Sequence, residues 1–125
     1  MNRLGPGVTP EGHSACVALV GLVAWQLPSF APVLTAHLEE MDGEVLPHLV
    51  MAAYEQKAEA LLSSDPASVV GLLKLLEQAA IRGVGEVDDL VFASFVENLP
   101  YPGESAEAIR SLLGPKLRSM LKHGI

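Results

Sequence analysis

The sequence predicts an all-α protein, a compact single-domain bundle of about six or seven helices over residues 1–125. Half of the residues are hydrophobic but only 5% are aromatic, a balance that favours helices over strands. No stretch alternates apolar and polar residues as a half-buried strand would. Proline and glycine pairs divide the chain into segments of helical length with short connections, so neighbouring helices should pack antiparallel.

Helix-start signals locate the first four helices. Thr9 can cap a helix that has Pro10 at its first position, and residues 1–8 before it are expected to form a flexible tail. Asp65 followed by Pro66 is the strongest start signal in the chain. Helices are predicted over about 10–26, 31–41, 44–63 and 66–82.

The fifth predicted helix, over about 86–98, is apolar around most of its circumference and should therefore lie near the centre of the bundle. Residues 99–103 read Leu-Pro-Tyr-Pro-Gly and must form a loop. Two short helices should follow over about 104–113 and 115–122, separated by a Gly-Pro pair.

The apolar run 15–25 is too short to span a bilayer and has no signal-peptide cleavage pattern, so it is expected to be a core helix. We expect Trp25 to be a core residue and Cys16 a small buried hydrophobe. A single cysteine allows no internal disulfide, which fits a reducing compartment and a cytoplasmic protein.

Charge is divided unevenly along the chain. All 15 acidic residues precede residue 110, whereas residues 110–125 hold four basic residues and no acid. The net charge of the whole chain is −7. A negative body repels phosphate backbones and anionic membrane surfaces, so neither nucleic acid nor membrane is an expected partner. A basic protein surface is the expected partner.

Two acidic clusters are candidates for that binding surface. The first is a stripe on the predicted helix over 86–98, beside an aromatic residue that could anchor a partner. The second lies where the helix over 31–41 ends. Both could instead be ordinary solvated helix faces, and acids at 86–89 would suit a helix N-terminus. The candidate partner-binding residues are Glu86, Asp89, Glu97 and Tyr101 in the first cluster and Glu39, Glu40 and Asp42 in the second.

No nucleophile motif, phosphate-binding glycine loop or zinc motif occurs in the sequence. The only weak metal candidates are His37, Glu40, Glu44 and His48, which pair at helical spacing on two successive predicted helices. The alternative interpretation of these residues is a solvated acidic corner. We therefore expect no cofactor and no enzymatic activity.

Four segments resemble an uncharacterised bacterial family of small helical proteins, over about residues 30–121. They are the run His37–Leu49, the Leu-rich helix that ends at Glu77, the run Phe95–Leu99 and the run Leu113–Leu117. Such proteins resemble immunity proteins of toxin systems, which implies a non-enzymatic inhibitor that covers the basic cleft of a cognate toxin. The alternatives are a self-associating regulatory or scaffold module, with its basic tail on the acidic face of a second copy, and a metal-binding helical enzyme.

Overall fold

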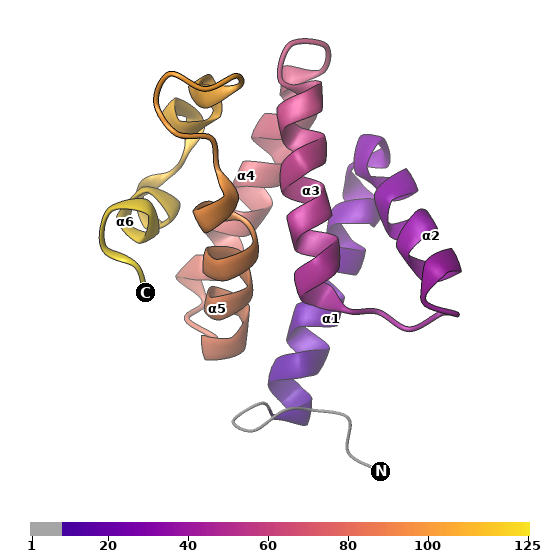
Figure 1. The fold of residues 1–125 in the computed structure, drawn as a ribbon. Coiled ribbons are helices and arrows are strands. Elements are labelled where there is room, and N and C mark those ends of the chain that lie inside the picture. The colour runs from indigo at the N-terminus through magenta and orange to yellow at the C-terminus, as the bar shows by residue number, and fades with distance from the viewer. Residues whose placement is uncertain (1–8) are drawn as a thin grey trace.

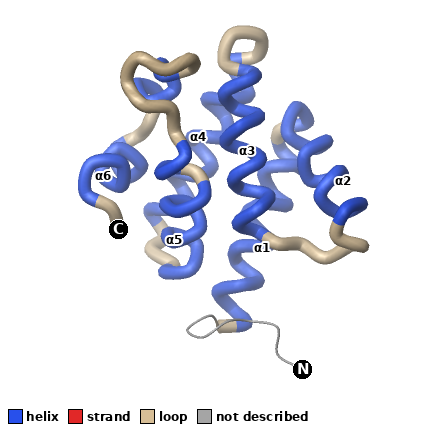
Figure 2. The backbone as a smooth tube through the Cα atoms, in the orientation of Figure 1, coloured by secondary structure: helices blue, strands red, loops and turns tan. Residues whose placement is uncertain are grey.

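The computed structural model describes residues 9–125 and is all-α, as predicted (Figures 1 and 2). Within these residues there are six α-helices, three short 3-10 helices and no strand. The expected flexible tail, residues 1–8, lies outside the described residues. The helices are α1 (Pro10–Gln26), η1 (Pro28–Phe30), α2 (Ala31–Glu40), α3 (Pro47–Leu61), α4 (Pro66–Ile81), α5 (Gly85–Ser94), η2 (Val96–Asn98), η3 (Glu107–Leu112) and α6 (Pro115–His123).

The first five α-helices run alternately up and down in Figure 1, with α2 and α6 on opposite sides of the bundle. Helix α5 contacts α1, α3, α4 and α6, which confirms the predicted central position of the fifth helix. The core joins these helices through fully buried side chains. The hydroxyl of Tyr54 on α3, for example, donates a 2.8 Å hydrogen bond to the carbonyl of Val20 on α1. Burial raises the pKa of this hydroxyl above its ordinary value.

Both side-chain caps expected from the sequence are present. The hydroxyl of Thr9 accepts a 3.0 Å hydrogen bond from the backbone N–H of Gly12 at the start of α1. At the start of α4, Asp65 accepts hydrogen bonds from the backbone N–H of Ser68 at 3.3 Å and from the hydroxyl of Ser29 at 2.7 Å. Hydrogen bonds from Ser68 and then Ser29 lower the pKa of Asp65. The α4 cap therefore also holds the segment before α2.

The helix expected over 44–63 begins later, at Pro47, and two further predicted helices are wrong in their extent. The helix expected over 86–98 ends at Ser94, because Phe95 leaves helical geometry (φ −121°, ψ −63°) while its ring is fully buried. The helix expected over 104–113 is only the 3-10 helix η3, which Ala106 precedes in the left-handed region at φ 63°. In both places packing and loop contacts override an apolar pattern that would suit a longer α-helix.

Trp25 is not a core residue: 84% of its surface is exposed. The buried stripe of α1 passes through Cys16, Leu19, Val20 and Val23, and Trp25 lies outside it, so this helix is not buried on all sides. Cys16 is buried, as expected. Burial, and then the nearby carboxylates of Glu86 and Asp89, raise the pKa of its thiol.

No single helix among the described residues has both the length and the apolar character that crossing a membrane requires.

Helix α6 begins on a carboxylate supplied by another helix. The two side-chain oxygens of Glu77, on α4, accept hydrogen bonds from the backbone N–H groups of Lys116 at 2.8 Å and Leu117 at 3.0 Å. Gly114 permits this approach, since a Cβ there would lie 2.7 Å from the Glu77 carboxyl. A negative group at this position satisfies two free N–H groups and complements the helix dipole.

We therefore expect Glu77→Ala to lower the free energy of unfolding by about 1–2 kcal/mol, because it leaves the first turn of α6 uncapped. Urea unfolding of the wild type and the variant checks this. The neighbouring exposed residue supplies the control, Gln78→Ala, which should change stability by less than about 0.5 kcal/mol. Equal stability of the two variants would contradict the capping role.

Candidate functional site

An acidic pocket lies where α3, η2 and the following loop meet. Glu59, Glu97 and Glu104 line it together with the ring of Tyr101, around a hollow of about 460 Å³. Its other lining residues are Asn98, Leu99, Pro100 and Ser105, so within residues 9–125 no basic side chain contributes to its wall. The structure thus brings together Glu97 and Tyr101, two of the predicted partner-binding residues.

The loop that carries Tyr101 is held by side chains bonded to its own backbone. Glu104 accepts a 2.6 Å hydrogen bond from the N–H of Tyr101, and Glu107 accepts one of 3.1 Å from Gly103. Arg110 donates a 3.0 Å hydrogen bond to the carbonyl of Pro100. These bonds hold the loop in place while 69% of the surface of Tyr101 stays exposed. The aromatic ring is therefore displayed from a fixed backbone.

Glu55 is buried one helical turn before Glu59 on α3, with only 2% of its surface exposed. Burial, followed by the hydrogen bond to Glu59 and repulsion from its charge, raises the pKa of Glu55 to about 9. The Oε2 atom of Glu55 is buried and has no hydrogen-bond partner. With this raised pKa and its burial, Glu55 carries a proton at neutral pH and can donate it in the hydrogen bond to Glu59. It therefore adds no charge to the acidic pocket beside Glu59.

The acidic residues of the first predicted cluster do not form one continuous surface in the structure. Glu86 packs its carboxylate against the first turn of α1, where a Cβ on Gly12 would collide with it. Asp89 is exposed. Neither residue lines the acidic pocket, since the end of α5 at Ser94 separates them from Glu97. Glu86 thus complements a helix N-terminus, the structural role that the sequence left open.

The basic tail is largely engaged within the fold. Helix α6 packs on α4, α5 and η2. Arg110 bonds to Pro100, and Arg118 donates a 2.7 Å hydrogen bond to the carbonyl of Leu113. Burial raises the pKa of Asp88, and the positive charge of Lys116 opposes part of this shift. The tail therefore stabilises the side of the bundle next to α5.

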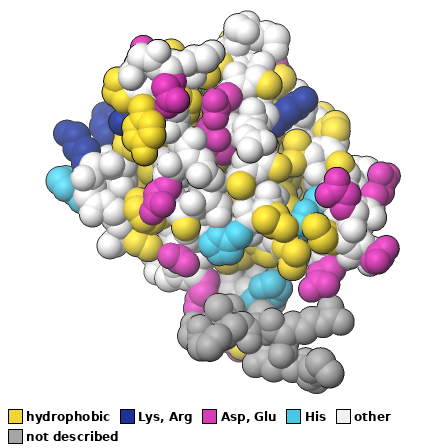
Figure 3. All heavy atoms as spheres, viewed as in Figure 1, with side chains coloured by type: hydrophobic (Ala, Val, Ile, Leu, Met, Phe, Trp, Pro, Cys, Tyr) yellow, Lys and Arg dark blue, Asp and Glu magenta, His cyan; other side chains and the backbone are white. Residues whose placement is uncertain are grey.

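The second acidic cluster is at the end of α2. Glu39, Glu40 and Asp42 are all exposed, and Asp42 adopts a left-handed backbone conformation (φ 51°) in the turn after the helix. Figure 3 shows the acidic side chains of this face in two groups, one over α5 and the segment above it and one around the end of α2. Helix α6 lies on the other side of the bundle, so the tail does not cover this second cluster.

The four metal candidates are not brought together. His37 is buried, and its Nε2 atom accepts a 3.0 Å hydrogen bond from the backbone N–H of Leu46. The Nδ1 atom of His48 lies 2.6 Å from the hydroxyl of Ser94 on α5. No group of three His, Cys, Asp or Glu side chains within residues 9–125 is arranged to hold a metal ion. The two histidines instead fasten the turn after α2 and the start of α3.

Sequence reasoning missed Glu55 and Glu59. The signal was present, because Glu55 falls on the stripe of α3 that also carries Met51, Tyr54 and Ala58 inward, and Glu59 follows it at i+4. An acid on an apolar stripe is a candidate for a perturbed pKa.

A family model described as a domain of unknown function (DUF7674) matches residues 21–124. This range contains the acidic pocket, the end of α2 and most of the bundle. No curated protein matches the chain, and no solved structure does.

Proposed function

The chain belongs to the DUF7674 family, whose function is unknown, and we propose that it is an immunity protein, which binds a cognate basic toxin and neutralises it. The acidic pocket is the proposed binding site. Three carboxylates of the pocket wall stand beside an exposed tyrosine, with no basic residue in that wall. This is the observation on which the proposal depends.

The arrangement suits a lysine or arginine of the partner. Carboxylates attract the cation, and the ring of Tyr101 offers it an aromatic face. Clustered charge of one sign also accelerates encounter with an oppositely charged surface and makes the association rate sensitive to salt. An inhibitor of this kind acts by occupying a basic cleft and excluding an anionic substrate such as a nucleic acid or a nucleotide.

Self-association through the basic tail is a weaker alternative. Arg110 and Arg118 donate to backbone carbonyls of their own chain, and Lys116 acts on Asp88. A second copy would have to compete with these internal contacts.

Charge reversal of the pocket tests the proposal. We expect the double variant Glu59→Lys and Glu97→Lys to bind the proposed cognate toxin at least about 100-fold more weakly, because each reversal replaces an attraction with a repulsion. Titration calorimetry gives the dissociation constant, and survival of cells that express the toxin gives the protection.

The matched control is the double variant Glu39→Lys and Glu40→Lys, which makes the same change of charge at the end of α2. It should retain binding and protection, and circular dichroism should show both variants folded. If only the control variant loses binding, the binding surface is the end of α2 and the pocket is wrongly assigned. If both variants protect as well as the wild type, inhibition does not depend on acidic charge.

A further inference from the structure

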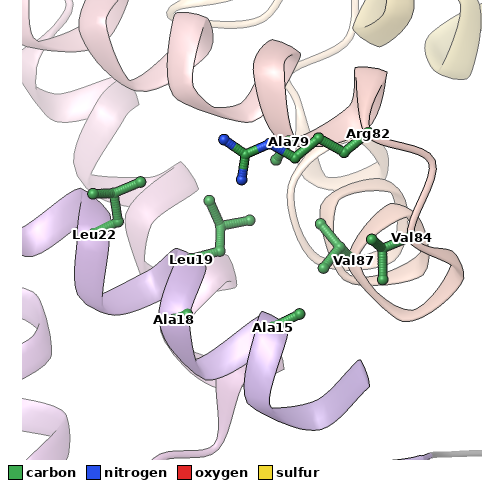
Figure 4. A pocket seen from close by; sticks show the side chains of 8 residues that line it. All are labelled: Ala15, Ala18, Leu19, Leu22, Ala79, Arg82, Val84 and Val87. Carbon is green, nitrogen blue, oxygen red and sulfur yellow. The ribbon is translucent and has the colours of Figure 1, made fainter. Parts of the chain in front are cut away.

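A second hollow lies on another part of the molecule, between α1, the end of α4 and the start of α5. Figure 4 shows Ala15, Ala18, Leu19 and Leu22 of α1 on one side and Val84 and Val87 on the other. Ala79 and Arg82 of the α4 end complete the lining, around a volume of about 280 Å³. Apart from Arg82, every lining side chain is apolar. We call this hollow the α1 groove.

Among the described residues that line the groove, Arg82 is the only charged one. Its side chain extends from the end of α4 across the mouth towards α1 (Figure 4). In the part of the chain that the structure describes, its guanidinium makes no hydrogen bond or ion pair. This contrasts with Arg110 and Arg118, which both donate to backbone carbonyls. The planar guanidinium of Arg82 therefore remains available to a carboxylate.

The apolar surface continues beyond the groove. Trp25 follows Leu22 on α1 by three residues, about one helical turn, and 84% of its surface is exposed. The lack of side-chain volume at Ala15 and Ala18 creates the hollow itself. A cavity near 280 Å³ is just below the range of sizes that hold drug-sized ligands, about 300–1,000 Å³, and suits a smaller molecule.

We propose that the α1 groove binds a small amphipathic carboxylate, with its apolar chain among the alanine, leucine and valine side chains and its carboxylate on Arg82. We choose this class of ligand because Arg82 is an unpaired cation at the mouth of an apolar hollow. It complements a molecule that has one negative group attached to an apolar body. The proposal goes beyond the toxin-binding function and does not depend on it, since none of the groove residues lines the acidic pocket.

Decanoate is a suitable probe, and Trp25, the one tryptophan of the sequence, is a built-in reporter. Titration of the wild type at 0.15 M NaCl should give a saturable change in tryptophan fluorescence, below the concentration at which decanoate self-associates. Octanoate should bind more weakly, by about fourfold for each methylene that the groove buries. Decanol, which lacks the charge, should bind about fivefold more weakly than decanoate.

Two variants and their matched controls locate the ligand. Arg82→Gln should bind decanoate and decanol equally, whereas Lys74→Gln, an exposed change on the same helix, should preserve the preference for decanoate. Ala18→Leu fills the groove and should abolish binding of both ligands, whereas Ala36→Leu on the exposed face of α2 should not. Leucine is a good helix former, so both of these variants should fold.

Three results would overturn the proposal. One is a fluorescence change that does not saturate, and another is decanoate binding that survives Ala18→Leu. The third is sedimentation of the wild type as a dimer that Ala18→Leu converts to a monomer, because the groove would then be an interface between two copies.

Discussion

Replacing Glu55 with glutamine should stabilise the protein by about 2 kcal/mol at pH 7.5 and should change its stability little at pH 4. The carboxyl of Glu55 is almost completely buried, and its pKa of about 9 in the folded chain is far above the ordinary value of 4.5. The folded protein therefore keeps a proton that the unfolded chain releases.

The sign follows from linkage. Well below pH 4.5 Glu55 is protonated in both states, so its ionisation adds nothing to the free energy of unfolding. As the pH rises from 4.5 towards 9, the unfolded chain gains an ionised, hydrated carboxylate that the folded chain cannot match, so the unfolded state is favoured. In this range the free energy of unfolding falls by up to about 1.4 kcal/mol per pH unit. We expect a smaller total loss, about 2 kcal/mol at pH 7.5, because the site relaxes around the carboxyl. Glutamine is neutral at every pH, and its amide can still donate to Glu59.

Unfolding by urea at a series of pH values from 4 to 9 gives the measurement. The wild type should lose stability steadily across this range, and Glu55→Gln should remove much of that loss. Glu40→Gln, an exposed change of the same kind on α2, should leave the wild-type slope intact. A wild type whose stability is constant from pH 5 to pH 8 would show that Glu55 is ionised in the folded protein.

The destabilisation caused by Glu55 at neutral pH suggests a role for this residue in the acidic pocket. Natural proteins retain destabilising groups most often where function requires them. Glu55 is hydrogen-bonded to Glu59 in the pocket wall, so a cation from a partner would favour the ionised form of both residues. Under the proposed function, Glu55→Gln should therefore give a more stable protein that binds its partner less tightly.

Helix starts were predictable because their causes are local. Thr9 and Asp65 cap their helices through residues three positions later, and Pro47 and Pro115 fall in first turns where the missing N–H is tolerated. The end of α5 was not predictable, because the backbone leaves the helix where Phe95 packs into the core. The capping of α6 by Glu77 likewise joins residues about forty positions apart.

The candidate site was predictable only in part. Glu97 and Tyr101 stood out because they are an acid and an aromatic residue near a proline-rich loop. Glu59 joins them only because α3 passes beside η2, a tertiary contact that spacing does not reveal. The exposure of Trp25 was missed for a similar reason. Composition marks the helix as apolar, but only the packing decides which of its faces is buried.

The buried face of α4 carries the last prediction. Leu76 has no exposed surface and lies on the apolar stripe of α4, which packs against α5 and α6. Leu75, one residue earlier, is only half-buried and packs against the edge of the core. Leu76→Ala should lower the free energy of unfolding by about 3 kcal/mol, within the range of about 2–5 kcal/mol for a buried leucine, because the cavity adds to the lost transfer energy. Leu75→Ala should cost less than half as much.

Urea unfolding of the two alanine variants compares the same chemical change on two faces of one helix. Helix propensity favours alanine equally at both positions, so the difference between them reports burial alone. The dependence of the unfolding free energy on urea should stay the same in both, since neither variant changes the surface exposed on unfolding very much. If Leu75→Ala were as costly as Leu76→Ala, α4 would have to be rotated by about one residue, or 100°. Such a rotation would also move Glu77 away from the N-terminus of α6, so the stabilities of the Leu75, Leu76 and Glu77 variants together determine the register of α4.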